Sequence, residues 1–376
     1  MRIFAQKALL PEGLAENVTV SAENGVITGV EREKPEADMT CAILTPGLID
    51  VHIHGGAGFS ARNFGMTGIE TFLEQMRNAG VTGFLMTVST ARRELMREGL
   101  ETTRLAMQLQ KEGKLGGPLI LGVHLEGPFL SLKKSGAMQK SAILSSGAEA
   151  YDHFFAGYED IIRLVTLAPE EEGAQELIAH LKAMGVCVQS GHTDATYEEA
   201  KRCFDAGVTS MCHTFNGCRG IHHREPGVVT AALEDERIYT EAICDLVHLH
   251  PAILRMMHRL KGPQRMMGIS DTVHTHGLPD GNYQAEGYDI VVKNGVSRLV
   301  DGSLDGGGAY VDEGVRNLVS IGIPMADALT MASMTPADRI GLGHGIEAGC
   351  PAHLTLWDEQ LKPVTTLVQG EAQWRS

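Results

Sequence analysis

Two histidines stand one residue apart at the end of a short apolar run. The stretch Thr45-Pro-Gly-Leu-Ile-Asp-Val-His-Ile-His-Gly-Gly56 is typical of a β-strand that glycines terminate. Side chains alternate along a strand, so His52 and His54 are expected to point the same way. Two imidazoles at the carboxyl end of a strand form half of a metal site. From this stretch alone, the alternative of two histidines on the solvent face of an edge strand stays open.

Four later apolar runs each end in a side chain that binds a metal or moves a proton. These residues are Glu126, His192, His213 and Asp271. Imidazoles with a carboxylate suit a divalent metal such as Zn²⁺ or Fe²⁺, whereas Ca²⁺ and Mg²⁺ prefer oxygen ligands. A divalent ion with an open coordination position activates water. Asp271 is then expected to take a proton from that water and deliver it to a leaving group.

A repeated strand-then-helix pattern must position these residues. Strand candidates begin near Leu48, Gly83, Leu119, Ile161, Val186, Thr209, Tyr239 and Met266. Amphipathic helices are expected at residues 68–79, 92–112, 172–184 and 196–206. Eight units of this kind predict an α/β fold, a (β/α)8 TIM-type barrel, in which active sites lie at the carboxyl ends of the strands. The candidate residues all fall at those ends.

Strand-like runs also occupy both ends of the chain. They lie at residues 3–5, 18–20, 25–30, 353–357 and 365–368. Neither end is long enough for a core of its own. We therefore expect residues 1–46 and 346–376 to form one small β-sandwich domain beside a barrel hydrolase domain of residues 47–345.

The bulk composition excludes several classes of protein. A formal net charge of −15 over 376 residues argues against a nucleic-acid binder, which needs a basic surface. Seven scattered cysteines without a Cys-x-x-Cys pair indicate free thiols in a reducing compartment. The amino terminus lacks a signal peptide, and no apolar run is long enough to cross a membrane. The sequence predicts a cytoplasmic protein that does not bind membranes.

Six motifs, in order and with matching spacing, resemble those of the N-acetylglucosamine-6-phosphate deacetylases, a branch of the amidohydrolase superfamily. They are Thr45–Gly56, His124-Leu-Glu-Gly-Pro-Phe129, Gly191-His-Thr-Asp-Ala-Thr196, His213-Thr-Phe-Asn216, Arg224-Glu-Pro-Gly227 and Gly277-Leu-Pro-Asp-Gly281. The resemblance implies a metal-dependent barrel with a flanking β-sandwich. It also implies that the protein removes acetate from an amino sugar phosphate and forms a homodimer.

The resemblance also assigns roles to individual positions. Glu126, His192 and His213 match the ligands of the main metal ion. His52 and His54 match a pair that holds a second ion together with Glu126, while Asp271 matches the catalytic acid and base. The positions expected to contact the sugar phosphate are Asn216, Gly217, Arg224 and His248. The family's equivalent of Arg224 often reaches into the neighbouring subunit's site, where its planar fork suits a phosphate.

The chain departs from the family pattern where substrate contacts are expected. The departures are Met138 in place of a common histidine, Gly217-Cys218 and Leu246, and two additional histidines, His274 and His276, expected to be loop residues. They leave open another N-acyl sugar phosphate, such as N-acetylgalactosamine 6-phosphate. The remaining alternatives are a cyclic amide hydrolase and a sugar-phosphate-binding protein without catalysis. The metal, Zn or Fe, and the number of ions, one or two, also stay open.

Overall fold

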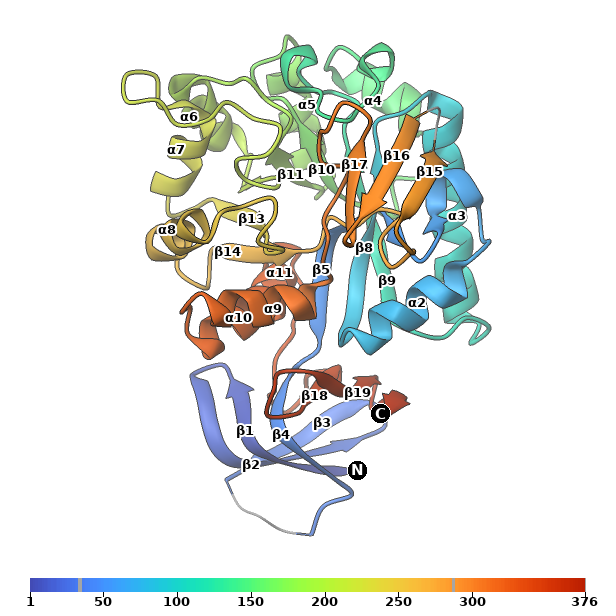
Figure 1. Ribbon diagram of the computed structural model, residues 1–376, viewed down its shortest axis with the longest axis vertical. Coiled ribbons are helices and arrows are strands. Elements are labelled where there is room, and N and C mark those ends of the chain that lie inside the picture. The colour runs from blue at the N-terminus through green and yellow to red at the C-terminus, as the bar shows by residue number, and fades with distance from the viewer. Residues whose placement is uncertain (33–35, 286–287, 376) are drawn as a thin grey trace.

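An eight-stranded parallel sheet, closed into a barrel, forms the centre of the molecule (Figure 1). The structure is a computed structural model that describes residues 1–32, 36–285 and 288–375. The barrel strands are β5 (Leu48–Ile53), β8 (Val81–Ser89), β9 (Leu119–Glu126), β10 (Ile162–Leu167), β11 (Cys187–Ser190), β12 (Ser210–Met211), β13 (Tyr239–Ile243) and β14 (Met266–Ile269). They pair in chain order, and the Asp271 amide donates to the His52 carbonyl at 2.9 Å, which joins the last strand to the first. The predicted (β/α)8 barrel is confirmed.

Helices follow most of the barrel strands and cover the outside of the barrel. They are α2 (Ile69–Asn78), α3 (Arg93–Lys111), α4 (Ala148–Phe155), α5 (Ala174–Ala183), α6 (Tyr197–Ala206), α7 (Gly227–Glu234), α8 (Pro251–Lys261), α9 (Val311–Ser320) and α10 (Met325–Ala332). A further helix, α11 (Met334–Arg339), packs at the amino-terminal end of the barrel. At the start of α6, the Thr196 side chain accepts from the Glu199 amide while the Glu199 side chain accepts from the Thr196 amide. This capping box fixes where the helix begins. The four predicted helices are α2, α3, α5 and α6, each within two residues of the predicted bounds.

The inside of the barrel is packed at its amino-terminal end. Ile49, Leu85 and Met267 are buried there against Ala337 of α11. From the same helix, Arg339 donates to the Ser210 hydroxyl at 2.9 Å and to a backbone carbonyl of β11. Because these side chains fill the amino-terminal end, a site inside the described barrel is expected at the carboxyl end.

Both ends of the chain join in a second, seven-stranded sheet, which Figure 1 shows below the barrel. Its order is β20 (Glu371–Arg375), β19 (Pro363–Val368), β18 (Leu354–Trp357), β4 (Met39–Pro46), β1 (Arg2–Leu10), β2 (Gly13–Glu23) and β3 (Val26–Glu31). Val18, Val20, Leu354 and Leu367 are buried in a hydrophobic core separate from that of the barrel. The predicted β unit from both chain ends is confirmed. We propose that it comprises residues 1–46 and 346–376, beside a barrel unit of residues 47–345.

Several smaller elements surround the open end of the barrel. They are β6 (Gly55–Gly56), β7 (Phe59–Ser60), α1 (Ala61–Phe64), the 3-10 turns η1 (Leu132–Lys134) and η2 (Lys140–Ala142), and an antiparallel sheet of β15 (Gly281–Ala285), β16 (Tyr288–Lys293) and β17 (Val296–Leu299). This three-stranded sheet was not predicted from the sequence. Within the described ranges, no helix has the length and apolarity needed to span a membrane.

Candidate active site

His52 of β5 and His54, just after that strand, lie beside two carboxylates, Glu126 at the end of β9 and Asp271 two residues after β14. His52 Nε2 is 3.3 Å and His54 Nε2 is 3.1 Å from the same oxygen, Asp271 Oδ1. Both nitrogens also approach Glu126, at 3.6 and 3.4 Å. The expectation that the two side chains point the same way is therefore confirmed, and the alternative of a solvent-facing pair is wrong because His52 is fully buried.

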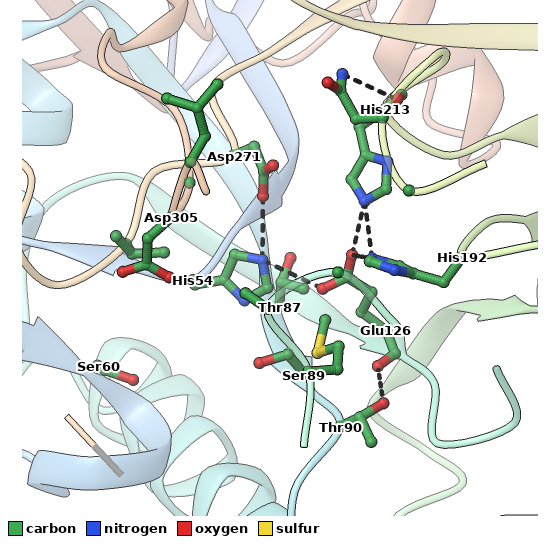
Figure 2. Close-up of a pocket in the computed structure, with 18 of the residues that line it drawn as sticks. His54, Ser60, Thr87, Ser89, Thr90, Glu126, His192, His213, Asp271 and Asp305 are labelled. Carbon is green, nitrogen blue, oxygen red and sulfur yellow. Dashed lines mark hydrogen bonds and ion pairs between the residues drawn. The ribbon is translucent and has the colours of Figure 1, made fainter. Parts of the chain in front are cut away.

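His192 and His213 complete the cluster from the other side of Glu126. Their Nε2 atoms lie 3.1 and 3.0 Å from Glu126 Oε1 and only 3.2 Å from each other. Figure 2 shows the two rings on one side of Glu126, with His54 and Asp271 on the other. The structure thus brings together all six residues that were predicted from the sequence to lie at strand ends. Their roles, five as metal ligands and Asp271 as the proton carrier, stay predictions.

The hydrogen bonds of two imidazoles show that the cluster suits a cation. His192 Nδ1 donates to the Lys134 carbonyl at 2.8 Å, so the neutral ring has a bare Nε2. His52 Nδ1 faces the Glu241 carboxylate at 3.0 Å, and its buried Nε2 has no hydrogen-bond partner among the described residues. Bare nitrogens and carboxylate oxygens would repel one another unless a positive ion lay between them. The residues therefore fit a divalent metal held by nitrogen and oxygen.

Both carboxylates of the cluster are held in the ionised form. Burial raises the pKa of Glu126, but hydrogen bonds from His192 and His213, which form when their Nε2 atoms carry protons, outweigh it and bring the pKa well below its usual range; a metal ion would take the place of those protons. Burial also opposes ionisation of Asp271, but the positive charge of His52 in its protonated form and the hydrogen bond from His54 lower the pKa of Asp271 to about 2; a metal ion at the same place would also supply positive charge. Each carboxylate is thus available as a ligand or as a proton acceptor.

The backbone is left-handed at two of these residues. His192 has φ +46° and Asp271 has φ +52°, a conformation that side chains other than glycine rarely adopt. The turn after each strand is held by backbone hydrogen bonds, including the one from the Asp271 amide to the His52 carbonyl. The surrounding barrel therefore holds His192 and Asp271 in a left-handed backbone conformation that is unfavourable for residues with a Cβ.

A cavity of about 370 Å³ opens above the cluster. Asn216, Gly217 and His248 line it, as the resemblance implied. Gly217 has φ +54°, and a Cβ there would lie 2.9 Å from His192 Nδ1, so a larger residue would press on that ring. Arg224 is exposed and lies outside the set of described side chains that line the cavity of its own chain.

The departures from the family pattern fall partly inside this cavity. Met138 lines it together with Gly217. Cys218 and Leu246 do not belong to the described lining residues, although Cys218 is buried nearby. His274 and His276 lie in a loop, as predicted, but His274 is buried and lines the cavity, which the sequence analysis did not anticipate.

Several neighbours of the cluster could not be picked out from the sequence. Glu241 is fully buried, and its Oε2 accepts from His52 Nδ1 and from the His213 amide, both at 3.0 Å. Cys212 Sγ lies 3.7 Å from His52 Nδ1 and could contribute a soft ligand atom. One feature of the sequence could have pointed to Glu241: it is a charged residue in the middle of the predicted strand that begins at Tyr239.

Comparisons with known proteins give a consistent result. The family model described as the amidohydrolase family matches residues 43–373. The N-acetylgalactosamine-6-phosphate deacetylase of Escherichia coli O157:H7 is 32% identical, over 98% of this chain and 97% of the relative. The N-acetylglucosamine-6-phosphate deacetylase of Vibrio furnissii is 33% identical, over 97% and 93%.

A solved structure agrees over nearly the whole chain. A mutant of the N-acetyl-D-glucosamine-6-phosphate deacetylase of Mycobacterium smegmatis, in complex with N-acetyl-D-glucosamine-6-phosphate, superposes with a TM-score of 0.91 at 32% identity. The match covers 99% of this chain and 98% of that one. Family membership also implies a divalent metal, which the histidine and carboxylate groups are able to bind. The chain therefore belongs to the amidohydrolase family, beside deacetylases of N-acetylated amino sugar phosphates.

Proposed function

We propose that this protein removes the acetyl group from an N-acetylated amino sugar 6-phosphate, with N-acetylglucosamine 6-phosphate as the main candidate substrate. The observation that carries this proposal is the convergence of His54, Glu126, His192, His213 and Asp271 at one cavity. The named relatives act on this class of substrate. Because one of them is named for the galacto epimer, N-acetylgalactosamine 6-phosphate is the second candidate.

Glu126, His192 and His213 are the proposed ligands of one divalent ion, zinc or iron. His52 and His54, with Glu126 between the sites, are the proposed ligands of a second. An ion bound there would polarise the amide carbonyl and make a water molecule more acidic. The donor set of imidazole and carboxylate supports zinc or iron over calcium or magnesium.

Asp271 is the proposed acid and base. Its Oδ1 lies 3.3 and 3.1 Å from the Nε2 atoms of His52 and His54, at the place where a water molecule would be activated. A carboxylate with a low pKa is ready to accept a proton from that water. Passing the proton to the departing nitrogen releases the sugar as a free amine and the acyl group as a carboxylic acid.

Asn216, Gly217 and His248 are proposed to hold the sugar phosphate on the His192 side of the cavity. Asn216 Nδ2 donates to the His213 carbonyl at 3.2 Å, so it is fixed next to the ligands. Arg224 is exposed on the loop that follows β12, with its guanidinium beside His223. We propose that it serves the site of the partner subunit in a homodimer.

The first experiment measures acid release. Purified protein loaded with zinc or iron should release acetate from N-acetylglucosamine 6-phosphate, and a chelator should abolish the release. The galacto epimer and the unphosphorylated sugar are assayed beside it. Release that persists after complete metal removal, or a preference for the unphosphorylated sugar, would contradict the proposal.

A second experiment tests the role of Arg224. Mixing Asp271→Asn subunits with Arg224→Ala subunits should restore activity above that of either variant alone, because one site in a mixed dimer keeps both residues. A monomeric protein, or mixtures as inactive as their components, would rule out this role.

A further inference from the structure

Asp245 and His248 form a buried pair in the loop that follows β13. The Asp245 Oδ2 atom accepts from His248 Nδ1 at 2.8 Å. Only 2% of the Asp245 side chain and 7% of the His248 side chain are exposed. His248 lines the cavity and is one of the residues proposed to hold the sugar phosphate. Because the carboxylate occupies Nδ1, Nε2 is the ring nitrogen that remains for a ligand.

The other oxygen of Asp245 shapes the loop itself. Its Oδ1 accepts from the Val247 amide at 2.9 Å and from the His248 amide at 2.8 Å. Hydrogen bonds from an aspartate to amides two and three residues further on are typical of a tight turn. The turn contains Leu246 with φ +61°, a left-handed conformation that is rare for a residue with a Cβ. One carboxylate oxygen therefore holds the turn, and the other holds the imidazole.

The oxygen that holds the imidazole is also fixed from the opposite direction. The Gly308 amide donates to Asp245 Oδ2 at 3.1 Å. The preceding amide, of Gly307, donates to the Asp271 carbonyl at 2.7 Å. The carboxylate thus connects the His248 ring to the segment that also holds the backbone of the proposed proton carrier. With amides on both of its oxygens, the carboxylate has little freedom to turn away from the ring.

The charge of the carboxylate suits the task of binding a phosphate. Burial raises the pKa of Asp245, but the hydrogen bond from the His248 ring outweighs it, together with those from the two amides of the turn, and the pKa lies below its usual value. A phosphate offers oxygen acceptors, so a histidine that binds it must donate from Nε2. An imidazole that donates from both nitrogens is a cation, and an ionised carboxylate behind it balances that charge.

We propose that Asp245 is a positioning residue for the reaction, which holds the His248 ring so that Nε2 donates to the phosphate of the substrate. This inference rests on the proposed function, in which the phosphate lies at His248. Asp245 itself does not touch the substrate and acts through the imidazole. Its role is therefore distinct from that of the residues that contact the sugar or the metal.

Asp245→Asn separates this role from the fold of the loop. The asparagine oxygen can take the place of Oδ1 and still accept from the two amides of the turn. The NH₂ group then takes the place of Oδ2, where it faces two other donors, His248 Nδ1 and the Gly308 amide. The turn is kept, whereas the ring loses its acceptor.

The test compares N-acetylglucosamine 6-phosphate with N-acetylglucosamine, which lacks the phosphate. Asp245→Asn should lower the ratio of the two kcat/KM values about 10-fold, mainly through a higher KM for the phosphorylated substrate, and should keep its metal. Glucosamine 6-phosphate should bind about 10-fold more weakly, while glucosamine binds as before. An unchanged ratio with unchanged binding of glucosamine 6-phosphate, or a loss confined to kcat, would overturn the proposal.

A similar pair on the surface provides the matched control. Asp152 of α4 and His180 of α5 approach to 2.7 Å, with 57% and 29% of their side chains exposed. Asp152→Asn removes the same kind of carboxylate from an imidazole outside the cavity. It should leave the kcat/KM ratio and the binding of glucosamine 6-phosphate unchanged, and a loss equal to that of Asp245→Asn would overturn the assignment.

A double variant shows whether Asp245 acts through the imidazole. His248→Ala should lower the kcat/KM ratio, and adding Asp245→Asn should then change it by less than about 2-fold, because the group that Asp245 positions is gone. A second full loss in the double variant would mean that Asp245 acts by another route, which contradicts the proposal.

Nuclear magnetic resonance of the unmodified protein with ¹⁵N-labelled histidine keeps the proposal testable even if a variant fails to fold. His248 Nδ1 should carry a proton throughout, and glucosamine 6-phosphate should shift the Nε2 resonance toward its protonated value. An Nε2 resonance that ignores this ligand would refute the assignment.

These measurements separate the two proposals. If the metal-loaded protein hydrolyses N-acetylglucosamine 6-phosphate and Asp245→Asn keeps the full preference for the phosphate, only the inference about Asp245 fails. If the protein hydrolyses neither substrate, the deacetylase proposal fails, and weaker binding of glucosamine 6-phosphate to Asp245→Asn would still support the role of Asp245.

Discussion

Glu241 offers a sharp test of how the protein supports its metal ligands. This fully buried carboxylate accepts from His52 Nδ1 and from the His213 amide. In Glu241→Gln the amide oxygen keeps the shape of the acceptor but loses its charge. The hydrogen bond that keeps the proton on His52 Nδ1, and therefore leaves Nε2 bare, becomes weaker.

The expected loss follows from that change. Removing the outer partner of a ligating histidine lowers metal affinity about 10- to 100-fold, or about 1.4–2.7 kcal/mol. The new amide NH₂ would replace Glu241 Oε1, which has no hydrogen-bond partner in the described parts of the chain. A buried donor without an acceptor adds a cost to folding of about 1–3 kcal/mol.

The assay titrates metal-free protein with Zn²⁺ in competition with a chelator, and urea unfolding is followed separately. Glu176→Gln, an exposed change on α5, is the control and should leave both quantities as they were. Activity of Glu241→Gln should return with excess metal. A folded Glu241→Gln protein that binds zinc as tightly as the unmodified chain would refute the reasoning.

Four further changes have definite expected results. Asp271→Asn should keep its metal but lose about 10²–10⁴-fold in turnover, the usual contribution of a positioned acid or base; metal analysis and kinetics on one preparation check this. His192→Ala should lose the main metal ion, and full occupancy by metal analysis would remove His192 from the ligand set. Met138→His should raise kcat/KM for the gluco 6-phosphate relative to the galacto and manno epimers, because a histidine offers a hydrogen-bonding group that Met138 lacks. Measuring kcat/KM for the three substrates with both proteins checks this. Asp235→Asn should lower the free energy of unfolding by about 1–3 kcal/mol at pH 7. Hydrogen bonds from Arg237 hold the pKa of the Asp235 carboxyl well below its usual range, so this stabilisation is present above about pH 4 and is lost as the pH falls further; urea unfolding of both proteins across that range measures it.

The barrel could be predicted because its pattern is local. Each strand is an apolar run, each helix has a period close to 3.6, and Thr196 with Glu199 forms a capping box readable from the sequence. The positions of Glu126 and Asp271 follow from the rule that sites of this fold lie at the carboxyl ends of strands. Their roles as ligand and proton carrier stay predictions until the variants are measured.

What could not be predicted depends on contacts between distant segments. The hydrogen bonds from Arg62 to the carboxyl end of β8 and between His52 and Glu241 join residues that no local sequence pattern connects. The sheet of β15 to β17 was missed because its strands are short and lie in a segment rich in turn residues. Likewise, the sequence predicts that His274 is a loop residue, and its place in the lining of the cavity becomes visible once the barrel is folded.

The left-handed backbone at His192 and Asp271 has a consequence for evolution and engineering. A residue with a Cβ gives up about 1 kcal/mol or more in that conformation, whereas glycine adopts it freely. At these two positions, selection for thermal stability and selection for turnover therefore favour different residues. A library screened for folding alone is expected to accept glycine there and to accumulate well-folded chains that no longer react, so any stabilisation campaign on this barrel must include an activity screen.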